Sequence, residues 1–219
     1  RIWGPFDADY SGSTLSRSGE MLYFVSTDKA NPQGALFQIP LLGGVPPRRI
    51  LEGISSPVTF SPDQKEMAFI REGKGETSLV VANADGSGTA RIIATRKFPE
   101  YFSTDGPSWS PDGKVIACGA GTIVPSVQAS VVEVPAQGGT ERVIAAGKWS
   151  GLSRVLWLPD GSGLVANGWE TPNAIGTQIW YVSYPEGNAR KITNNLFGYG
   201  ESSLGLTADG STIVAVLQD

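Results

Sequence analysis

The sequence predicts an all-β fold: a β-propeller of four-stranded antiparallel blades. Three observations support this prediction. One short phrase recurs five times along the 219 residues, the same order of apolar runs and turns follows each copy, and no amphipathic helix pattern of useful length is present. Gly 28 and Pro 15 are high counts, as expected for many short strands joined by turns.

The recurring phrase is an apolar residue, a small polar residue (Leu158 in the fourth copy) and a short turn that contains Asp or Gly. The five copies are Leu15–Gly19, Phe60–Gln64, Trp109–Gly113, Trp157–Gly161 and Leu206–Gly210. Their second positions are residues 16, 61, 110, 158 and 207, so the steps are 45, 49, 48 and 49 residues. A period of this length indicates packed copies of one supersecondary unit.

Each copy begins a unit of four predicted strands, A to D, with the phrase on strand A. Short apolar runs predict strand B at 21–25, 67–70, 115–118, 164–166 and 213–216. A variable loop and strand C follow at 36–39, 79–81, 131–134 and 179–182. A Gly-containing turn then leads to a basic residue and strand D at 49–51, 91–93, 142–144 and 191–192. Such units are typical of propeller blades, because each blade needs neighbours to cover its two faces.

The Pro-Asp-Gly turns explain the recurring carboxylates. Proline presets φ near −65°, Asp can bond its own backbone, and Gly tolerates positive φ. We therefore interpret Asp63, Asp112, Asp160 and Asp209 as turn residues. Gln64 stands where the other turns have glycine.

The repeats predict one domain over residues 1–219. Its four full blades cover about 15–53, 59–97, 108–147 and 156–195, and a partial fifth combines 205–219 with residues 1–5. An incomplete last blade would leave an open strand edge, which favours self-association.

Composition excludes several classes of function. The net charge is −4 and no basic stripe is visible, which argues against nucleic-acid binding. No apolar run approaches the roughly 18 residues of a membrane-spanning helix. The chain has no histidine, which excludes Ser-His-Asp and Cys-His sites within it, and its single cysteine, Cys118, lies in an apolar run. We expect no catalytic residues and no cofactor.

The phrases Phe60-Ser61-Pro62-Asp63 and Trp109–Lys114 resemble the PD40 (WD40-like) repeat of the TolB propeller and of the propellers of prolyl-oligopeptidase-type peptidases. The segment Tyr181–Asn195, with Leu206–Gly210, is similar to the propeller of bacterial, notably acidobacterial, transmembrane Ser/Thr kinases.

This resemblance implies a non-catalytic binding or scaffold propeller. It would be an extracytoplasmic or periplasmic sensor, or a protein-interaction module, of a bacterial signalling protein whose kinase chemistry lies in other domains. The alternative is an accessory propeller of a peptidase, or a TolB-like periplasmic protein.

Binding candidates lie at one end of the predicted blades, where the B–C loops (27–34, 120–128 and 168–177) and the D–A segments emerge. The D–A segments carry the aromatic candidates Tyr10, Tyr101, Phe102, Trp149, Phe197 and Tyr199, besides Phe6. Two interpretations stay open. The rings could form an exposed face for a protein or small ligand. Alternatively they could cap the blade ends and pack inward, as aromatic rings more often do.

One segment resembles the opening of a calcium loop. Asp7, Asp9 and Ser11 place oxygen ligands at alternate positions, and Gly12 stands at the sixth. The twelfth position is Ser18 and not the bidentate Glu that such loops require, so a polar linker is the favoured interpretation.

Overall fold

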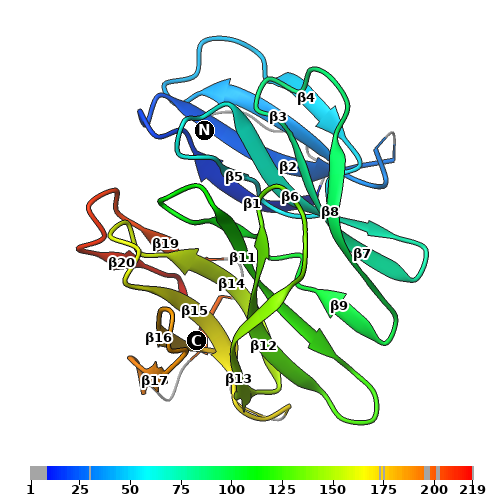
Figure 1. The fold of residues 1–219 in the computed structure, drawn as a ribbon. Helices are drawn as coiled ribbons and strands as arrows, with labels where there is room; N and C mark the ends of the chain where they lie inside the picture. Colours follow the sequence, from blue (N-terminus) through cyan, green and yellow to red (C-terminus); the bar gives the residue numbers. More distant parts are fainter. Residues whose placement is uncertain are drawn as a thin grey trace.

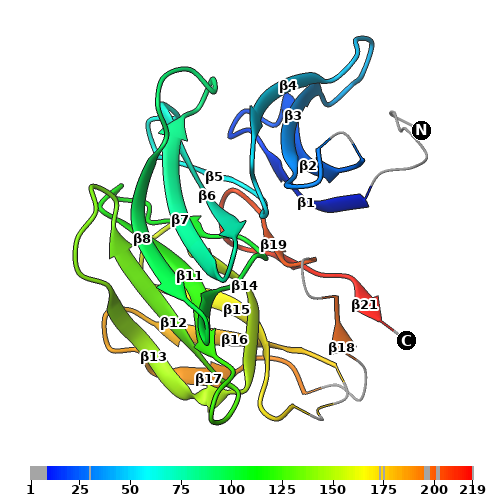
Figure 2. The same cartoon turned by 90° about the vertical axis from the view of Figure 1, so that its right-hand side faces the viewer.

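The computed structural model describes residues 9–29, 31–172, 174, 176–194, 198–200 and 203–218. Within these ranges every regular element is a strand, and no helix is long and apolar enough to cross a membrane. Four antiparallel sheets, each in chain order, are arranged as the blades of a propeller (Figures 1 and 2). The predicted all-β propeller is confirmed.

The strands of the first two blades are β1 (Asp9–Leu15), β2 (Met21–Thr27), β3 (Ala35–Pro40), β4 (Arg48–Glu52), β5 (Thr59–Phe60), β6 (Glu66–Gly73), β7 (Glu76–Asn83) and β8 (Arg91–Lys97). The third and fourth blades contain β9 (Glu100–Phe102), β10 (Ser108–Trp109), β11 (Val115–Thr122), β12 (Gln128–Pro135), β13 (Arg142–Trp149), β14 (Gly151–Trp157), β15 (Gly163–Trp169), β16 (Gln178–Ser183) and β17 (Ala189–Lys191). The last strands are β18 (Gly198–Tyr199), β19 (Gly205–Leu206), β20 (Ile213–Val214) and β21 (Leu217–Gln218).

Strand A is longer than the sequence pattern indicates. In the first blade β1 pairs with β2 from Asp9 onward, with a register shift between Tyr10 and Ser13. In the third blade both β9 and β10 pair with β11, so strand A is interrupted and then resumes. The placement of the aromatic candidates in D–A loops was therefore wrong for Tyr10, Tyr101 and Phe102, and Trp149 and Tyr199 also lie on strands, β13 and β18. Irregular pairing breaks the alternation of apolar and polar residues on which strand prediction depends.

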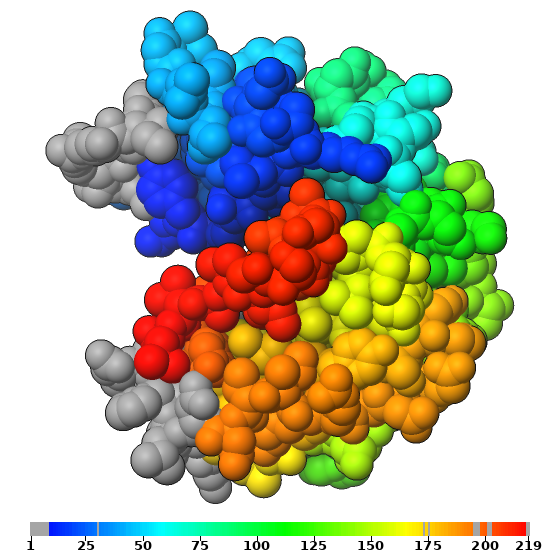
Figure 3. Space-filling model, turned by 90° about the vertical axis from the view of Figure 1, so that its left-hand side faces the viewer, coloured from blue at the N-terminus to red at the C-terminus, as the bar shows by residue number. Residues whose placement is uncertain are grey.

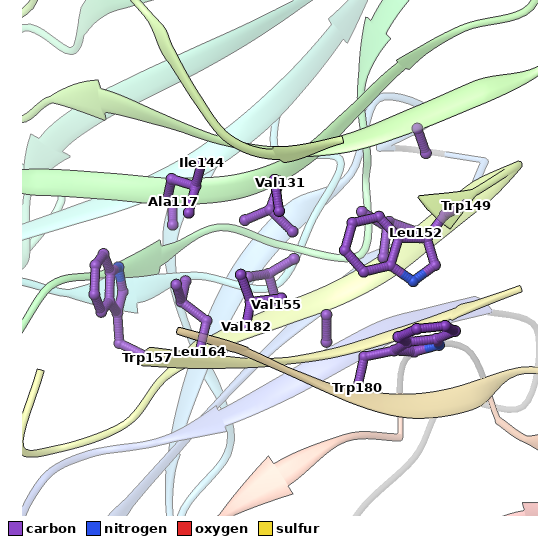
Figure 4. Packing of buried hydrophobic residues seen from close by; sticks show 13 residues of the cluster. Ala117, Val131, Ile144, Trp149, Leu152, Val155, Trp157, Leu164, Trp180 and Val182 are labelled. Carbon is purple, nitrogen blue, oxygen red and sulfur yellow. The ribbon is translucent and has the colours of Figure 1, made fainter. Parts of the chain in front are cut away.

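The apolar core lies between successive blades. Strands β11 to β13 of the third blade pack against β14 to β16 of the fourth, and Figure 4 shows this layer from close by. Trp149 meets Trp180 edge-on, with ring centroids 5.5 Å apart. Because each sheet buries a face against its neighbour, the blades stabilise one another.

Hydrogen bonds between small hydroxyl side chains and backbone groups join neighbouring A strands. Thr14 Oγ1 donates to the Val58 carbonyl at 2.7 Å. Thr59 Oγ1 accepts from the Trp109 amide at 3.1 Å, and the Ser108 hydroxyl accepts from the Trp157 amide at 3.0 Å. These bonds hold β1, β5, β10 and β14 side by side.

The last strands form two short antiparallel pairs, β18 with β21 and β19 with β20. They lie between the first blade and the fourth, where Figure 3 shows them in red between blue and yellow. The predicted contribution of residues 1–5 to this blade falls outside the described residues.

Candidate binding face

The turn end of the propeller carries the recurring carboxylates. The Ser61 hydroxyl donates to Asp63 Oδ1 at 2.7 Å, and the same oxygen accepts from the Lys65 amide at 3.1 Å. The third and last copies repeat this arrangement with Ser110, Asp112 and Lys114, and with Thr207, Asp209 and Ser211. These residues close turns, as the sequence predicted.

The hydrogen bonds also lower the pKa values of these carboxyl groups. A side-chain bond from Ser110 and a backbone bond from Lys114 lower the pKa of Asp112 below its ordinary value. At Asp209, bonds from Thr207 and Ser211 lower the pKa to about 2. A carboxylate held ionised in this way is a poor proton donor or acceptor near neutral pH.

Only part of the calcium-loop candidate lies within the described residues. Asp9 and Ser11 lie on β1, and Asp7 lies outside the described residues. In the described part of the chain, no group of three His, Cys, Asp or Glu residues is arranged to hold a metal ion.

Two of the predicted aromatic candidates pack inward. Phe102 is 1% exposed and Trp149 is 3% exposed. The Arg96 guanidinium lies over the Phe102 ring at 5.3 Å, in the layer between the second and third blades. Since both rings belong to inter-blade cores, they do not contribute to an exposed binding face.

The other candidates lie on different blades. Tyr10 is exposed on β1 and contacts Phe24. Tyr101, half-buried on β9, lies over Gly121, and burial raises the pKa of its hydroxyl. Tyr199 packs against the core between the fourth blade and the last strands, and Phe197 lies outside the described residues. Tyr10, Tyr101 and Tyr199 therefore belong to three separate blades.

An exposed apolar cluster lies beside Tyr101, at the end where the B–C loops emerge. Phe98 is 67% exposed, and the β11–β12 loop adds three exposed aliphatic side chains. The Ile123 amide donates to the Pro99 carbonyl at 3.2 Å, which holds the two segments together. We call this cluster the apolar rim: Phe98, Ile123, Val124 and Val127.

The sequence prediction missed the rim. The loop 120–128 is among the predicted variable loops, but neither its Ile-Val-Pro run nor Phe98 is among the predicted binding candidates. An apolar run at the tip of a hairpin is the available signal, because hairpin tips are ordinarily polar. Single exposed apolar residues are normal, whereas a contiguous group marks an interaction site.

The fourth blade holds a small pocket at the same end. Its volume is about 160 Å³, and it is lined by Trp169, Glu170, Gln178, Trp180 and Lys191, among others. Lys191 Nζ lies 2.6 Å from a Glu170 oxygen and 5.3 Å from the Trp180 ring centroid. Pockets for drug-sized ligands measure roughly 300–1,000 Å³, so this one suits only a very small group.

The thiol of Cys118 is not available as a nucleophile. It is buried on β11, and burial raises its pKa well above the ordinary value. The thiolate form that attacks substrates is therefore suppressed.

Structural comparison relates this fold to known propellers. A protein described as TolB from Agrobacterium tumefaciens superposes with a TM-score of 0.74 at 21% identity, over 100% of this chain and 73% of that one. An oligogalacturonate lyase from Vibrio parahaemolyticus gives 0.65 at 14% identity, over 98% of this chain and 61% of that one. A prolyl endopeptidase gives 0.56 at 17% identity, over 87% of this chain and 31% of that one.

The neighbours include proteins with different activities, and each is less than 25% identical to this chain. No family model and no curated protein matches the sequence. The comparisons therefore establish a TolB-type β-propeller fold, and function has to be argued from the site.

Proposed function

We propose that this chain is a non-catalytic binding propeller that docks a protein partner on the apolar rim. The observation that carries the proposal is the exposed cluster of Phe98, Ile123, Val124 and Val127 on a rigid sheet framework. Tyr101 borders it and supplies an aromatic ring with a polar tip. A central apolar anchor with a polar margin is the usual composition of protein-binding patches.

A small-molecule reaction is less well supported. The pocket of about 160 Å³ is too small for a sizeable substrate, and the carboxylates at the turn end are engaged in closing turns. The chain has no histidine, and Cys118 is buried. These observations favour binding over catalysis.

The parent protein is proposed from sequence resemblance. The similarity of Tyr181–Asn195 to kinase-linked propellers supports an extracytoplasmic sensor of a bacterial signalling protein, with the partner recognised outside the cytoplasm. In the second candidate function the chain is the accessory propeller of a peptidase, favoured by the superposition on a prolyl endopeptidase. The full-length gene separates the two, since a kinase domain or an α/β-hydrolase domain would be encoded beside the propeller.

Site-specific photocrosslinking in the native host tests the rim. Benzoylphenylalanine at position 98 should crosslink a discrete protein partner. The same group at Leu42, which is 99% exposed in a turn at the opposite end, should not. The double variant Phe98→Ser/Val124→Ser, with the photoreactive group at Tyr101, should lose the crosslink.

Equal crosslinking from positions 98 and 42 would contradict a specific rim site. So would a crosslink that survives the double serine variant. Both substitutions are on exposed side chains, so the variant should fold, which circular dichroism checks.

A further inference from the structure

One position of the repeat lies where the inner strands converge on the propeller axis. Counting four residues back from the second position of each phrase gives Gly12, Pro57, Gly106, Arg154 and Ser203. Gly12 packs so closely on Pro57 that no Cβ would fit there, and a Cβ at Gly106 would lie 3.2 Å from the Pro57 carbonyl oxygen. These equivalent residues of three successive blades therefore lie against one another.

Arg154 is the one long, charged residue of this set. It lies where β14 shifts register between Leu152 and Val155, as β1 does between Tyr10 and Ser13. The equivalent positions carry the much shorter Gly, Pro, Gly and Ser. Arg154 is only 9% exposed, and its Nε atom is buried without a hydrogen-bond partner in the described part of the chain.

Within the described part of the chain, neighbouring charges do not fully compensate this cation. Burial lowers the pKa of the Arg154 guanidinium, and the negative charge of Asp105 opposes that effect. Asp105 lies on the neighbouring blade and accepts a hydrogen bond from the Ser103 hydroxyl at 3.1 Å. Among the described residues, no carboxylate forms an ion pair with Arg154.

A guanidinium stays protonated at neutral pH even when it is buried. A buried cation without a paired anion is costly, and proteins normally compensate it with a counter-charge. At the axis of this propeller, that compensation is incomplete within the described residues.

We propose that Arg154 is the anchor of an anion-binding site at the propeller axis, which takes the carboxylate or phosphate group of a small ligand. The planar guanidinium suits both groups, because it can donate two parallel hydrogen bonds to their oxygens. The site is separate from the apolar rim and does not depend on the proposed protein partner.

Isothermal titration of the 219-residue protein with sodium acetate, and separately with sodium phosphate, tests the proposal. The titrations use constant ionic strength and chloride as the reference anion. Wild-type protein should bind one of the two anions saturably, and the preferred anion identifies the carboxylate or the phosphate as the natural group. Arg154→Met should weaken that binding by about tenfold or more, because the charge-assisted bonds are lost.

Two further variants keep the test decisive. Arg49→Gln removes an exposed arginine of β4 and should leave the affinity unchanged. Asp105→Asn removes the opposing charge and should tighten binding about threefold or more. This variant remains informative if Arg154→Met does not fold.

Four results would overturn the proposal: no saturable binding of either anion by the wild type, equal affinities of wild type and Arg154→Met, weakening in Arg49→Gln to the level of Arg154→Met, or unchanged or weaker binding by Asp105→Asn.

Discussion

Gly187, in the turn between β16 and β17, lies so close to the carbonyl oxygen of Ile144 in β13 that a Cβ atom would not fit between them. The same relationship links Gly86 to Ile50 two interfaces earlier, between the first and second blades. At these two interfaces the C–D turn docks its glycine on strand D of the preceding blade. The close spacing of the outer strands depends on these glycines.

We predict that Gly187→Ala lowers the free energy of unfolding by more than about 2 kcal/mol, since it adds a steric clash to the strain of positive φ. Gly138→Ala is the matched control. Gly138 also has positive φ, but a Cβ there would lie 3.9 Å from Ile93. This control should lose only about 1 kcal/mol, from backbone strain. Urea unfolding followed by tryptophan fluorescence measures both, and equal losses would show that the contact with Ile144 does not limit the blade spacing.

Gln64 is the one described residue other than glycine with positive φ, at 61°. Its side-chain amide donates to the Ser61 carbonyl at 2.9 Å, which offsets part of the strain. We predict that Gln64→Gly raises the free energy of unfolding by about 0.5 kcal/mol, because the relief of strain exceeds the lost hydrogen bond. The reverse substitution in the next blade, Gly113→Gln, should lower it by about 1 kcal/mol. Denaturant midpoints that move in the same direction for both variants would contradict this account.

The repeat and its turns were predictable because their causes are local. The Ser61-Pro62-Asp63 phrase specifies a turn through bonds between residues at most five apart. The irregular first half of strand A was not predictable in the first blade, because Ser11 and Gly12 show no alternation and lie in the register shift between paired Tyr10 and Ser13. The predicted aromatic face was also only partly useful, since the burial of Phe102 and Trp149 depends on neighbouring blades.

The apolar rim and the buried Arg154 were absent from the sequence prediction for two different reasons. The rim joins Phe98 with Ile123, two segments whose contact depends on the pairing of β9 with β11. Periodicity alone does not reveal that pairing. Arg154, by contrast, was visible as an arginine among Gly, Pro and Ser at one repeat position. Arg154 becomes a candidate binding residue only because it is buried, and the sequence does not show that burial.

Arg96 and Glu141 connect the second and third blades. Arg96 Nε lies 3.1 Å from a Glu141 oxygen, and a second bond joins Nη2 to the other oxygen. Burial lowers the pKa of Arg96, but the hydrogen bond and charge of Glu141 outweigh it, so the net pKa is raised. We predict that Arg96→Met and Glu141→Gln each cost about 2 kcal/mol, because each leaves the partner partly buried and unpaired. The double variant should cost clearly less than the sum, and additive losses in the double-mutant cycle would show that the pair is not coupled.

The turn carboxylates make stability depend on pH at the acid end. Hydrogen bonds lower the pKa of Asp63, Asp112 and Asp209 in the folded protein, to about 2 at Asp209 against an ordinary 3.8. The unfolded chain therefore binds more protons in this window, and stability rises with pH. The stabilisation from these carboxylates is complete at a pH above their ordinary pKa. It is lost as the pH falls through their pKa in the folded protein. We predict that the free energy of unfolding falls between pH 4 and pH 2, roughly the window these pKa values bracket.

The triple variant Asp63→Asn/Asp112→Asn/Asp209→Asn tests this assignment. Asn keeps an acceptor oxygen for the turn but does not titrate, so the variant should show a shallower loss of stability over the same pH range. Glu52→Gln, an exposed carboxylate of β4 outside these turns, controls for the removal of a negative charge. Urea unfolding at several pH values gives the slopes. The same slope in wild type and triple variant would mean that acid unfolding depends on other carboxylates, and that the Asp-bearing turns form equally well when protonated.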